Sequence, residues 1–215
     1  MTLIDNGTIH YRDEVVRKLI HLCSLSIPVI YYFIPKITAV YILAAFTLVA
    51  ILLDMSRHLF PQIGKYFNLI FGFLLRKHEL DKKKKNLNGA TYVFISALLS
   101  IIIFPKLLFL TAFPILIISD STAALIGRKW GRHKFLSKSL EGTLAFFVSA
   151  SIVVLFTPKL NGSITEYMIG ILATAVGAIV ENISHGYVDD NLSIPISVGF
   201  TMWLLYSLLL HVKFI

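Results

Sequence analysis

An aspartate inside an apolar segment is the first residue of this chain that could take part in chemistry. Asp120 lies in a hydrophobic run that ends at Gly127, and a carboxylate there is costly in lipid, so it marks a functional site by default. A basic loop with Gly127 and Gly131 follows. Glycines let the backbone approach a phosphate, and basic side chains bind its oxygens. The pattern predicts metal-assisted chemistry on a nucleotide and a lipid at a membrane surface.

Several residues next to apolar runs are candidates for holding the phosphates of a nucleotide. They are Arg17, Lys18, Asn88, Gly127, Arg128, Lys129, Gly131, Arg132, Lys138 and Ser139. Lys138 and Glu141, which open the next apolar run, join Asp120 as catalytic candidates. Simpler explanations stand beside these, since Ser139 is suited to cap a helix, Glu141 to favour the helix dipole, and Lys18 to reach the lipid headgroups.

Acidic residues near the ends of apolar runs predict a site for a divalent cation such as Mg²⁺, which takes oxygen ligands and bridges to phosphates. The candidates are Asp120, Glu181, Asp189 and Asp190. Asp190 or Asn191 has a second explanation as the N-cap of the next helix. For Asp120 the sequence leaves two roles open, a metal ligand or a base that accepts the proton of a substrate hydroxyl.

The elements that position these residues are expected to be membrane helices. Of the 215 residues, 56% are hydrophobic and 15% are charged, and the mean hydropathy is +0.77, which no soluble domain of this size needs. The apolar runs predict an all-α, polytopic membrane helical bundle of about seven transmembrane helices plus one interfacial helix at 59–75, in a single domain over 1–215. The spans are expected at roughly 16–35, 37–53, 87–105, 107–127, 140–157, 166–183 and 192–212.

The basic residues predict how the chain is oriented. Of the 20 Lys and Arg residues, all except Lys36, Lys106, Lys159 and Lys213 fall on one side of the expected spans. This asymmetry places the N-terminus and the active site in the cytoplasm and the C-terminus opposite, in the cell membrane if the source is prokaryotic. It also assigns the net charge of +8 to topology and anionic headgroups rather than to nucleic acid. The single Cys23 excludes an internal disulfide.

Five sequence stretches together resemble the CTP-dependent lipid-alcohol kinases, which include dolichol kinase, phytol kinase and CTP-dependent diacylglycerol kinase. The stretches are EVVRKLIH at 14–21, NGATY at 88–92, DSTAALIGRKWGRHKF at 120–135, SKSLEGTLAFF at 137–147 and VDDNLSIP at 188–195. The resemblance implies transfer of the terminal phosphoryl group of CTP to a lipid hydroxyl, with a divalent metal. It also implies that Arg17, Lys18, Asp120 and Gly127 matter for activity and that Lys138 lies in the CTP-binding stretch. The chain length is closest to that of phytol or polyprenol kinases.

Two alternatives stay open beside this reading. A phosphatidate cytidylyltransferase would use the same nucleotide and metal to make a CDP-lipid. A transporter would place its polar sites near the bilayer midplane, whereas here they gather at one face, which favours an enzyme. The expected partners are CTP, membrane lipids and a lipid alcohol, which is a polyprenol, a phytol- or farnesol-type isoprenoid or diacylglycerol. The choice of CTP over ATP rests on the resemblance, and the oligomeric state stays open.

Overall fold

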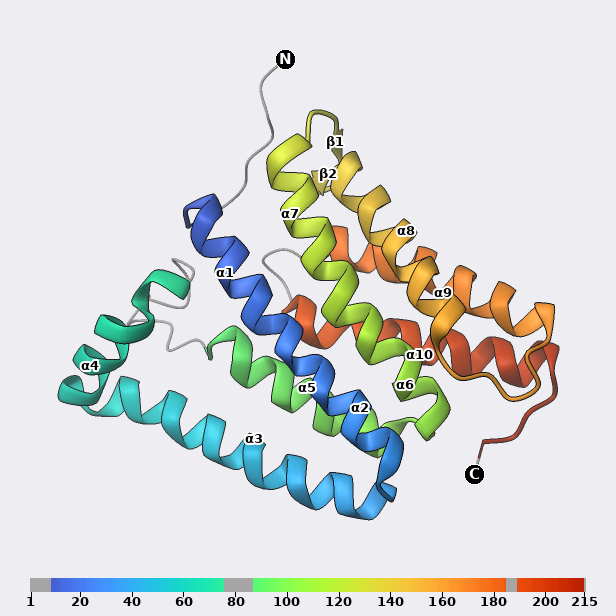
Figure 1. The fold of residues 1–215 in the computed structure, drawn as a ribbon, viewed down its shortest axis with the longest axis horizontal. Coiled ribbons are helices and arrows are strands. Elements are labelled where there is room, and N and C mark those ends of the chain that lie inside the picture. The colour runs from blue at the N-terminus through green and yellow to red at the C-terminus, as the bar shows by residue number, and fades with distance from the viewer. Residues whose placement is uncertain (1–8, 76–86, 185–188, 215) are drawn as a thin grey trace.

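The computed structural model describes residues 9–75, 87–184 and 189–214, and nearly all of them are helical (Figure 1). In chain order the elements are α1 (Tyr11–Leu22), η1 (Cys23–Leu25), α2 (Ser26–Phe33), α3 (Lys36–Leu59), α4 (Pro61–Phe71), η2 (Gly72–Leu74), α5 (Gly89–Ile103), α6 (Lys106–Ile115), η3 (Leu116–Asp120), α7 (Ser121–Trp130), β1 (Lys134–Phe135), β2 (Lys138–Ser139), α8 (Leu140–Phe156), α9 (Ile164–Ile183) and α10 (Asp190–Leu209). In Figure 1 the start of α1 and the β1–β2 hairpin lie toward the same end of the molecule.

The bundle is that of an integral membrane protein, as its composition predicts. Five helical units in the described part are long and apolar enough to cross a bilayer: Tyr11–Phe33, Lys36–Leu59, Lys106–Trp130, Ile164–Ile183 and Asp190–Leu209. The apolar helices α5 and α8 stand where two further spans are expected, but they have only 15 and 17 residues. The all-α membrane bundle is therefore confirmed, whereas the number of seven crossings stays a prediction.

Helix α4 lies within the segment 59–75, where an interfacial helix was predicted, and it is shorter than that segment. It has 11 residues, which is too few for a bilayer crossing and agrees with an interfacial helix in this segment. Its start packs closely on the end of α3, because a Cβ atom added to Gly64 would lie 2.6 Å from the carbonyl oxygen of Arg57. Tyr66 and Leu69 are 68% and 79% exposed. These exposed apolar side chains are suited to a lipid surface.

The unit formed by α6, η3 and α7 is the centre of the bundle. Of the residues in its apolar 18-residue stretch, 67% are buried, against 17% to 44% in the other candidate spans. Leu108, Phe109 and Phe113 are completely buried, and α6 packs against α2, α5, α8 and α10. Asp120 therefore ends a segment whose position is fixed from several directions.

A π-helical turn, η3, interrupts this central unit and ends at Asp120. Pro114, near the end of α6, has no N–H to give to the carbonyl four residues earlier, and its ring clashes with that carbonyl. A wider turn after such a break shifts the angular position of every later residue on the helix. The proline thus helps to set the direction in which Asp120 projects.

Two Pro-Lys turns lie at the end of the bundle away from the β1–β2 hairpin, one between α2 and α3 and the other between α5 and α6. The lysine of each turn contacts the helix end next to the other turn. The contacts are Lys36 Nζ to the carbonyl oxygens of Ile102 and Phe104, at 3.0 and 3.3 Å, and Lys106 Nζ to those of Tyr32 and Ile34, at 2.9 and 3.0 Å. Each lysine thus satisfies carbonyl groups left without partners at the end of the other pair's helix. Two of the four lysines outside the basic side therefore serve as helix caps.

Removing either capping lysine should weaken the bundle. We expect Lys36→Ala and Lys106→Ala each to lower the free energy of unfolding by about 0.5–1.5 kcal/mol, because the exposed carbonyl ends lose charged donors. Thermal unfolding in detergent measures this loss. Lys213→Ala, at an exposed lysine near the C-terminus, is the control. Melting temperatures equal to that of the unaltered protein in both capping variants would contradict the caps.

Candidate active site

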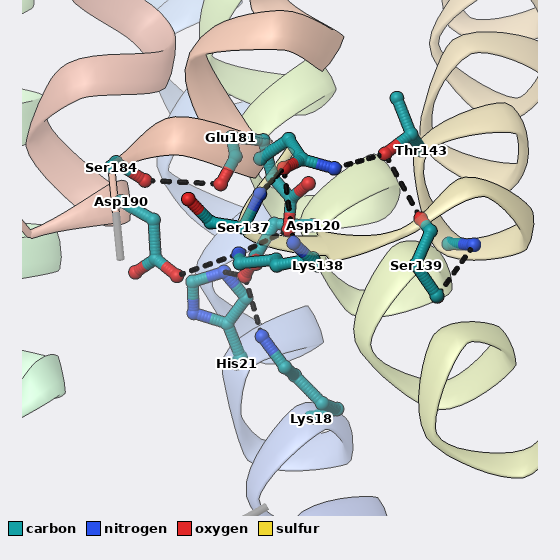
Figure 2. A network of polar contacts seen from close by, with 12 residues as sticks. Lys18, His21, Asp120, Ser137, Lys138, Ser139, Thr143, Glu181, Ser184 and Asp190 are labelled. Carbon is teal, nitrogen blue, oxygen red and sulfur yellow. Dashed lines mark hydrogen bonds and ion pairs between the residues drawn. The ribbon is translucent and has the colours of Figure 1, made fainter. Parts of the chain in front are cut away.

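Charged side chains from five separate elements meet near the end of the bundle that carries the β1–β2 hairpin (Figure 2). We call them the charged cluster; its members are Lys18 and His21 of α1, Asp120 of η3, Lys138 of β2, Glu181 of α9 and Asp190 of α10. The sequence analysis selected all of them except His21 as site residues; the sequence places His21 on the same helical face as Arg17 and Lys18, with headgroup contact or substrate orientation as its two possible roles. The fold thus brings together groups that lie up to about 170 positions apart in the sequence.

The deepest contact of the charged cluster is the ion pair between Lys18 and Asp120. The Lys18 Nζ atom lies 2.5 Å from Asp120 Oδ2, and the two side chains are only 6% and 4% exposed. Two charges taken out of water cost more than they gain unless they are closely paired. Because η3 lies at the bundle centre, this pair also fixes where α1 packs.

Lys138 makes the second group of ion pairs in the charged cluster. Its ammonium group is paired with the Glu181 carboxylate, and it lies 4.0 Å from Asp190 Oδ2. Burial lowers the pKa of Lys138, but the nearby carboxylates of Glu181, Asp190 and Asp120 outweigh burial and raise that pKa above its ordinary value. Lys138 therefore stays positively charged at neutral pH. Three carboxylates face two ammonium groups, so the cluster keeps an excess negative charge when His21 is neutral.

Asn182 fixes the backbone that carries Lys138. Its Oδ1 atom accepts the backbone N–H groups of Ser137 and Lys138 at 2.8 and 3.1 Å, and its Nδ2 atom donates to Thr143 Oγ1 at 2.6 Å. The side chain is completely buried. One amide thus ties the hairpin and α8 to α9 beside Glu181. The sequence analysis assigned Asn182 no role, although a buried amide next to an acid in an apolar helix was a usable signal.

Two glycines of the predicted phosphate loop are explained by helix packing. A Cβ atom on Gly127 would lie 3.0 Å from Ser139 Oγ and 3.3 Å from the Cα atom of Gly142. One on Gly131 would lie 2.8 Å from Ser139 Cβ. Ser139 itself accepts the N–H of Gly142 at 3.2 Å, which confirms its predicted capping of α8. The glycines let α7 and α8 cross closely, and contact of this loop with a phosphate stays a prediction.

The basic side chains of the same loop have two kinds of surroundings. Arg128 turns toward α1, where it donates to the carbonyl oxygen of Ile9 at 2.7 Å and lies 3.5 Å from the Glu14 carboxylate. Lys129 and Arg132 are exposed. Arg128 therefore ties α7 to α1, while the other two side chains remain on the surface near the charged cluster's end of the bundle.

Glu141 contacts the hairpin rather than a member of the charged cluster. Its carboxylate accepts the backbone N–H of His133 at 3.2 Å and lies 2.7 Å from the ring Nδ1 atom of the same residue. In the hairpin, Lys134 pairs with Ser139 and Phe135 with Lys138. Glu141 thus closes the base of the short hairpin that presents Lys138.

Two of the remaining predicted residues, Asp189 and Asn88, cap helices. Asp189, not Asp190 or Asn191, is the N-cap of α10, and it accepts the backbone and side-chain N–H groups of Asn191 at 3.0 and 2.7 Å. Asn88 caps α5 by accepting the N–H of Thr91 at 2.9 Å. Arg17 is partly buried on α1. His185 and the run Lys82 to Lys85 lie outside the described residues.

A second buried ion pair, which the sequence analysis did not select, supports Asn88. Asp54 is paired with Arg57 near the end of α3, and both are buried. The Asp54 Oδ2 atom accepts the backbone N–H of Asn88 at 2.6 Å. The pair therefore anchors the start of α5 to the end of α3, and the spacing of an acid and a base one helical turn apart was its only signal in the sequence.

The carboxylates of the charged cluster are candidate ligands for a divalent cation. The described residues contain no group of three or more His, Cys, Asp or Glu side chains that could hold a metal ion. Mg²⁺, however, usually keeps several waters and takes one or two carboxylates together with substrate phosphates. The oxygen donors of Glu181 and Asp190, on either side of Lys138, fit a metal that binds in this way.

Known proteins similar to this chain include lipid kinases. An uncharacterized protein of Rickettsia prowazekii is 33% identical over 86% of this chain and 90% of its own length. CTP-dependent diacylglycerol kinase 1 of Schizosaccharomyces pombe is 26% identical over 71% of this chain and 74% of its own, and the phytol kinase of Synechocystis is 29% identical over 39% and 38%. No protein-family model and no solved structure matches the chain.

The buried ion pair can be tested by its effect on stability. Lys18→Met should lower the free energy of unfolding by about 3–5 kcal/mol, because Asp120 then keeps a buried charge without its closest partner. The double variant Lys18→Met/Asp120→Leu should regain most of that loss. Denaturation in detergent gives the values, and strictly additive losses would show that the two charges do not interact.

The amide clamp can be tested by hydrogen exchange. In Asn182→Ala we expect the backbone N–H groups of Ser137 and Lys138 to exchange at least about tenfold faster, because they lose their acceptor. The control is Ser184→Ala, which removes a hydroxyl from the same end of α9 without touching the hairpin. Unchanged exchange in the Asn182 variant would rule out the clamp.

Proposed function

The chain belongs to the CTP-dependent lipid kinase family, and on that premise we propose that it transfers the terminal phosphoryl group of CTP to the hydroxyl of a membrane lipid alcohol. The observation that carries the proposal is the charged cluster. In it, the buried Asp120 is paired with Lys18 and acts electrostatically on Lys138. Phosphoryl transfer needs positioned charges more than covalent catalysis. A cluster of fixed carboxylates and ammonium groups at one end of a membrane bundle supplies such charges.

The nucleotide is proposed to bind beside the β1–β2 hairpin. Lys138 would contact the triphosphate, because it is held charged and fixed by the backbone clamp of Asn182. The exposed Arg132 is suited to bidentate contacts with further phosphate oxygens, and the exposed Lys129 would leave its present position over the Trp130 ring to make such a contact. Arg128 is assigned a positioning role instead, because it ties α7 to Glu14 of α1.

Asp120 is proposed as the acceptor of the alcohol proton. The lipid oxygen attacks the terminal phosphorus; the new O–P bond forms as the bond between that phosphorus and the oxygen bridging to the β-phosphate breaks. CDP leaves, and the hydroxyl proton passes to Asp120. Of the two roles that the sequence leaves open for this residue, this one fits its position better, since its Oδ2 atom faces Lys18 and His21 of α1.

A divalent cation is proposed as a cofactor, and the carboxylates of Glu181 and Asp190 would hold it. When bound, it would neutralise charge on the phosphates. Asp189 is engaged as the cap of α10, so its part is to orient the start of that helix. Lys138 neutralises only part of the charge of these two carboxylates before the metal and nucleotide arrive.

We also propose an orientation of the chain in the membrane. We place the charged cluster and the N-terminus at the cytoplasmic surface, where CTP is available, and the Pro-Lys turns at the opposite surface. The basic residues near the charged cluster and the four lysines elsewhere support this orientation. Helix α4 would then lie in the cytoplasmic headgroup region, with its exposed apolar side chains in lipid.

The proposed activity is tested with purified protein in nanodiscs that contain one lipid alcohol at a time: a polyprenol, phytol, farnesol or diacylglycerol. Mg²⁺ and CTP are added in the buffer. We expect CDP and a phosphorylated lipid in equal amounts with at least one alcohol. Asp120→Asn should reduce turnover by roughly 10²–10⁴-fold. Pyrophosphate formed from CTP and phosphatidic acid would instead indicate a cytidylyltransferase, and transport of a solute without CTP use would indicate a carrier.

A further inference from the structure

His21 is the member of the charged cluster whose polar group lacks a direct partner. It lies on α1 one turn beyond Lys18, and its side chain is 11% exposed (Figure 2). The Nε2 atom is sealed from solvent, and no described residue gives it a hydrogen bond. Buried ring nitrogens without a partner are rare in folded proteins, and each one calls for an explanation.

The nitrogen faces the Asp120 carboxylate without a direct hydrogen bond. Nε2 lies 3.9 Å from Asp120 Oδ2, which is too far for a hydrogen bond. One oxygen about 2.8 Å from each atom would bridge them, once the side chains that close off Nε2 move apart. We propose that His21 Nε2 and Asp120 Oδ2 together form the binding site for the acceptor hydroxyl, an inference that rests on the proposed kinase function.

The chemistry of the two groups selects a neutral hydroxyl. A hydroxyl both donates and accepts, so it can donate to the Asp120 carboxylate and accept from the His21 ring. A phosphate oxygen in the same place would face a carboxylate and be repelled. Lys18 already occupies the other side of Asp120 Oδ2 at 2.5 Å, which leaves a metal ion at that atom facing an ammonium group.

The surface beside His21 is suited to the tail of a lipid. Its neighbours Leu19 and Ile20 are 58% and 53% exposed, and in a membrane chain such side chains contact acyl or prenyl chains. The unit Tyr11–Phe33 is the least buried of the candidate spans. His21 lies about 15 Å along it from Tyr11. Helix α1 can therefore contact the tail of a lipid through its exposed side chains.

This site assigns the class of acceptor. It takes a lipid with one free hydroxyl on an apolar tail, and it disfavours phosphatidic acid, whose phosphate would meet Asp120. Two hydrogen bonds would also direct one lone pair of the oxygen away from His21 and Asp120, toward the nucleotide beside Lys138. His21 thus contributes to orienting the attacking atom as well as to binding it.

A matched pair of substitutions tests the assignment. The amide of His21→Gln places a polar atom where Nε2 stands, whereas that of His21→Asn places one nearer Nδ1. With the alcohol that supports turnover, we expect the KM for that alcohol to rise at least about tenfold in His21→Asn and by less than about threefold in His21→Gln. Affinity for CDP, measured without acceptor, should be unchanged in both. The control is Cys23→Ser, two residues further on with an exposed side chain.

Each outcome separates this inference from the proposed function. If the unaltered protein phosphorylates an alcohol but both His21 variants keep its KM, the hydroxyl site is wrong and the kinase stands. A loss of CDP affinity in His21→Asn would make the position part of the nucleotide site and overturn the inference. Equal KM increases in both variants, with CDP affinity kept, would show that His21 acts by packing. No turnover by the unaltered protein with any alcohol would reject the proposed function itself.

Discussion

A charge pair buried within a membrane protein is the constraint on which the rest of this structure depends. Lys18 and Asp120 are nearly inaccessible to solvent, so neither can lose the other without leaving a charge in a medium that solvates it poorly. The helix with the lysine must therefore pack on the most buried unit of the bundle. A second tie between Arg128 and Glu14, nearer the end of the bundle, holds the same two helices together.

The other half of the charged cluster is built by close backbone packing. Gly127 and Gly142 let α7 and α8 cross with almost no side-chain volume between them, which brings the connecting hairpin down against α9. Asn182 then fastens the hairpin by its backbone, so that Lys138 is delivered to Glu181 in one position. Rigid supports of this kind suit a site that must place several charges around a phosphate.

The arrangement explains how one site can serve a polar and an apolar substrate. Lys138, beside an exposed basic hairpin, lies where a nucleotide can approach from water, whereas His21 lies on a helix whose neighbouring side chains face lipid. Asp120 stands between these two sides and contacts both electrostatically. A reaction between a water-soluble and a membrane-bound reactant needs such a boundary, because neither partner can cross into the other's medium cheaply.

The sequence by itself determined the class of fold and the central residue. Hydropathy requires helices in lipid, and the cost of an intramembrane carboxylate singled out Asp120; local rules also identified Ser139 as a cap. Only the tertiary structure decided that Arg128 turns to α1, that Gly127 serves a helix crossing and that Asn182 clamps the hairpin. Those roles depend on contacts between segments distant in the chain. Hydropathy and capping act within one helix, whereas partner choice is set by how the helices pack.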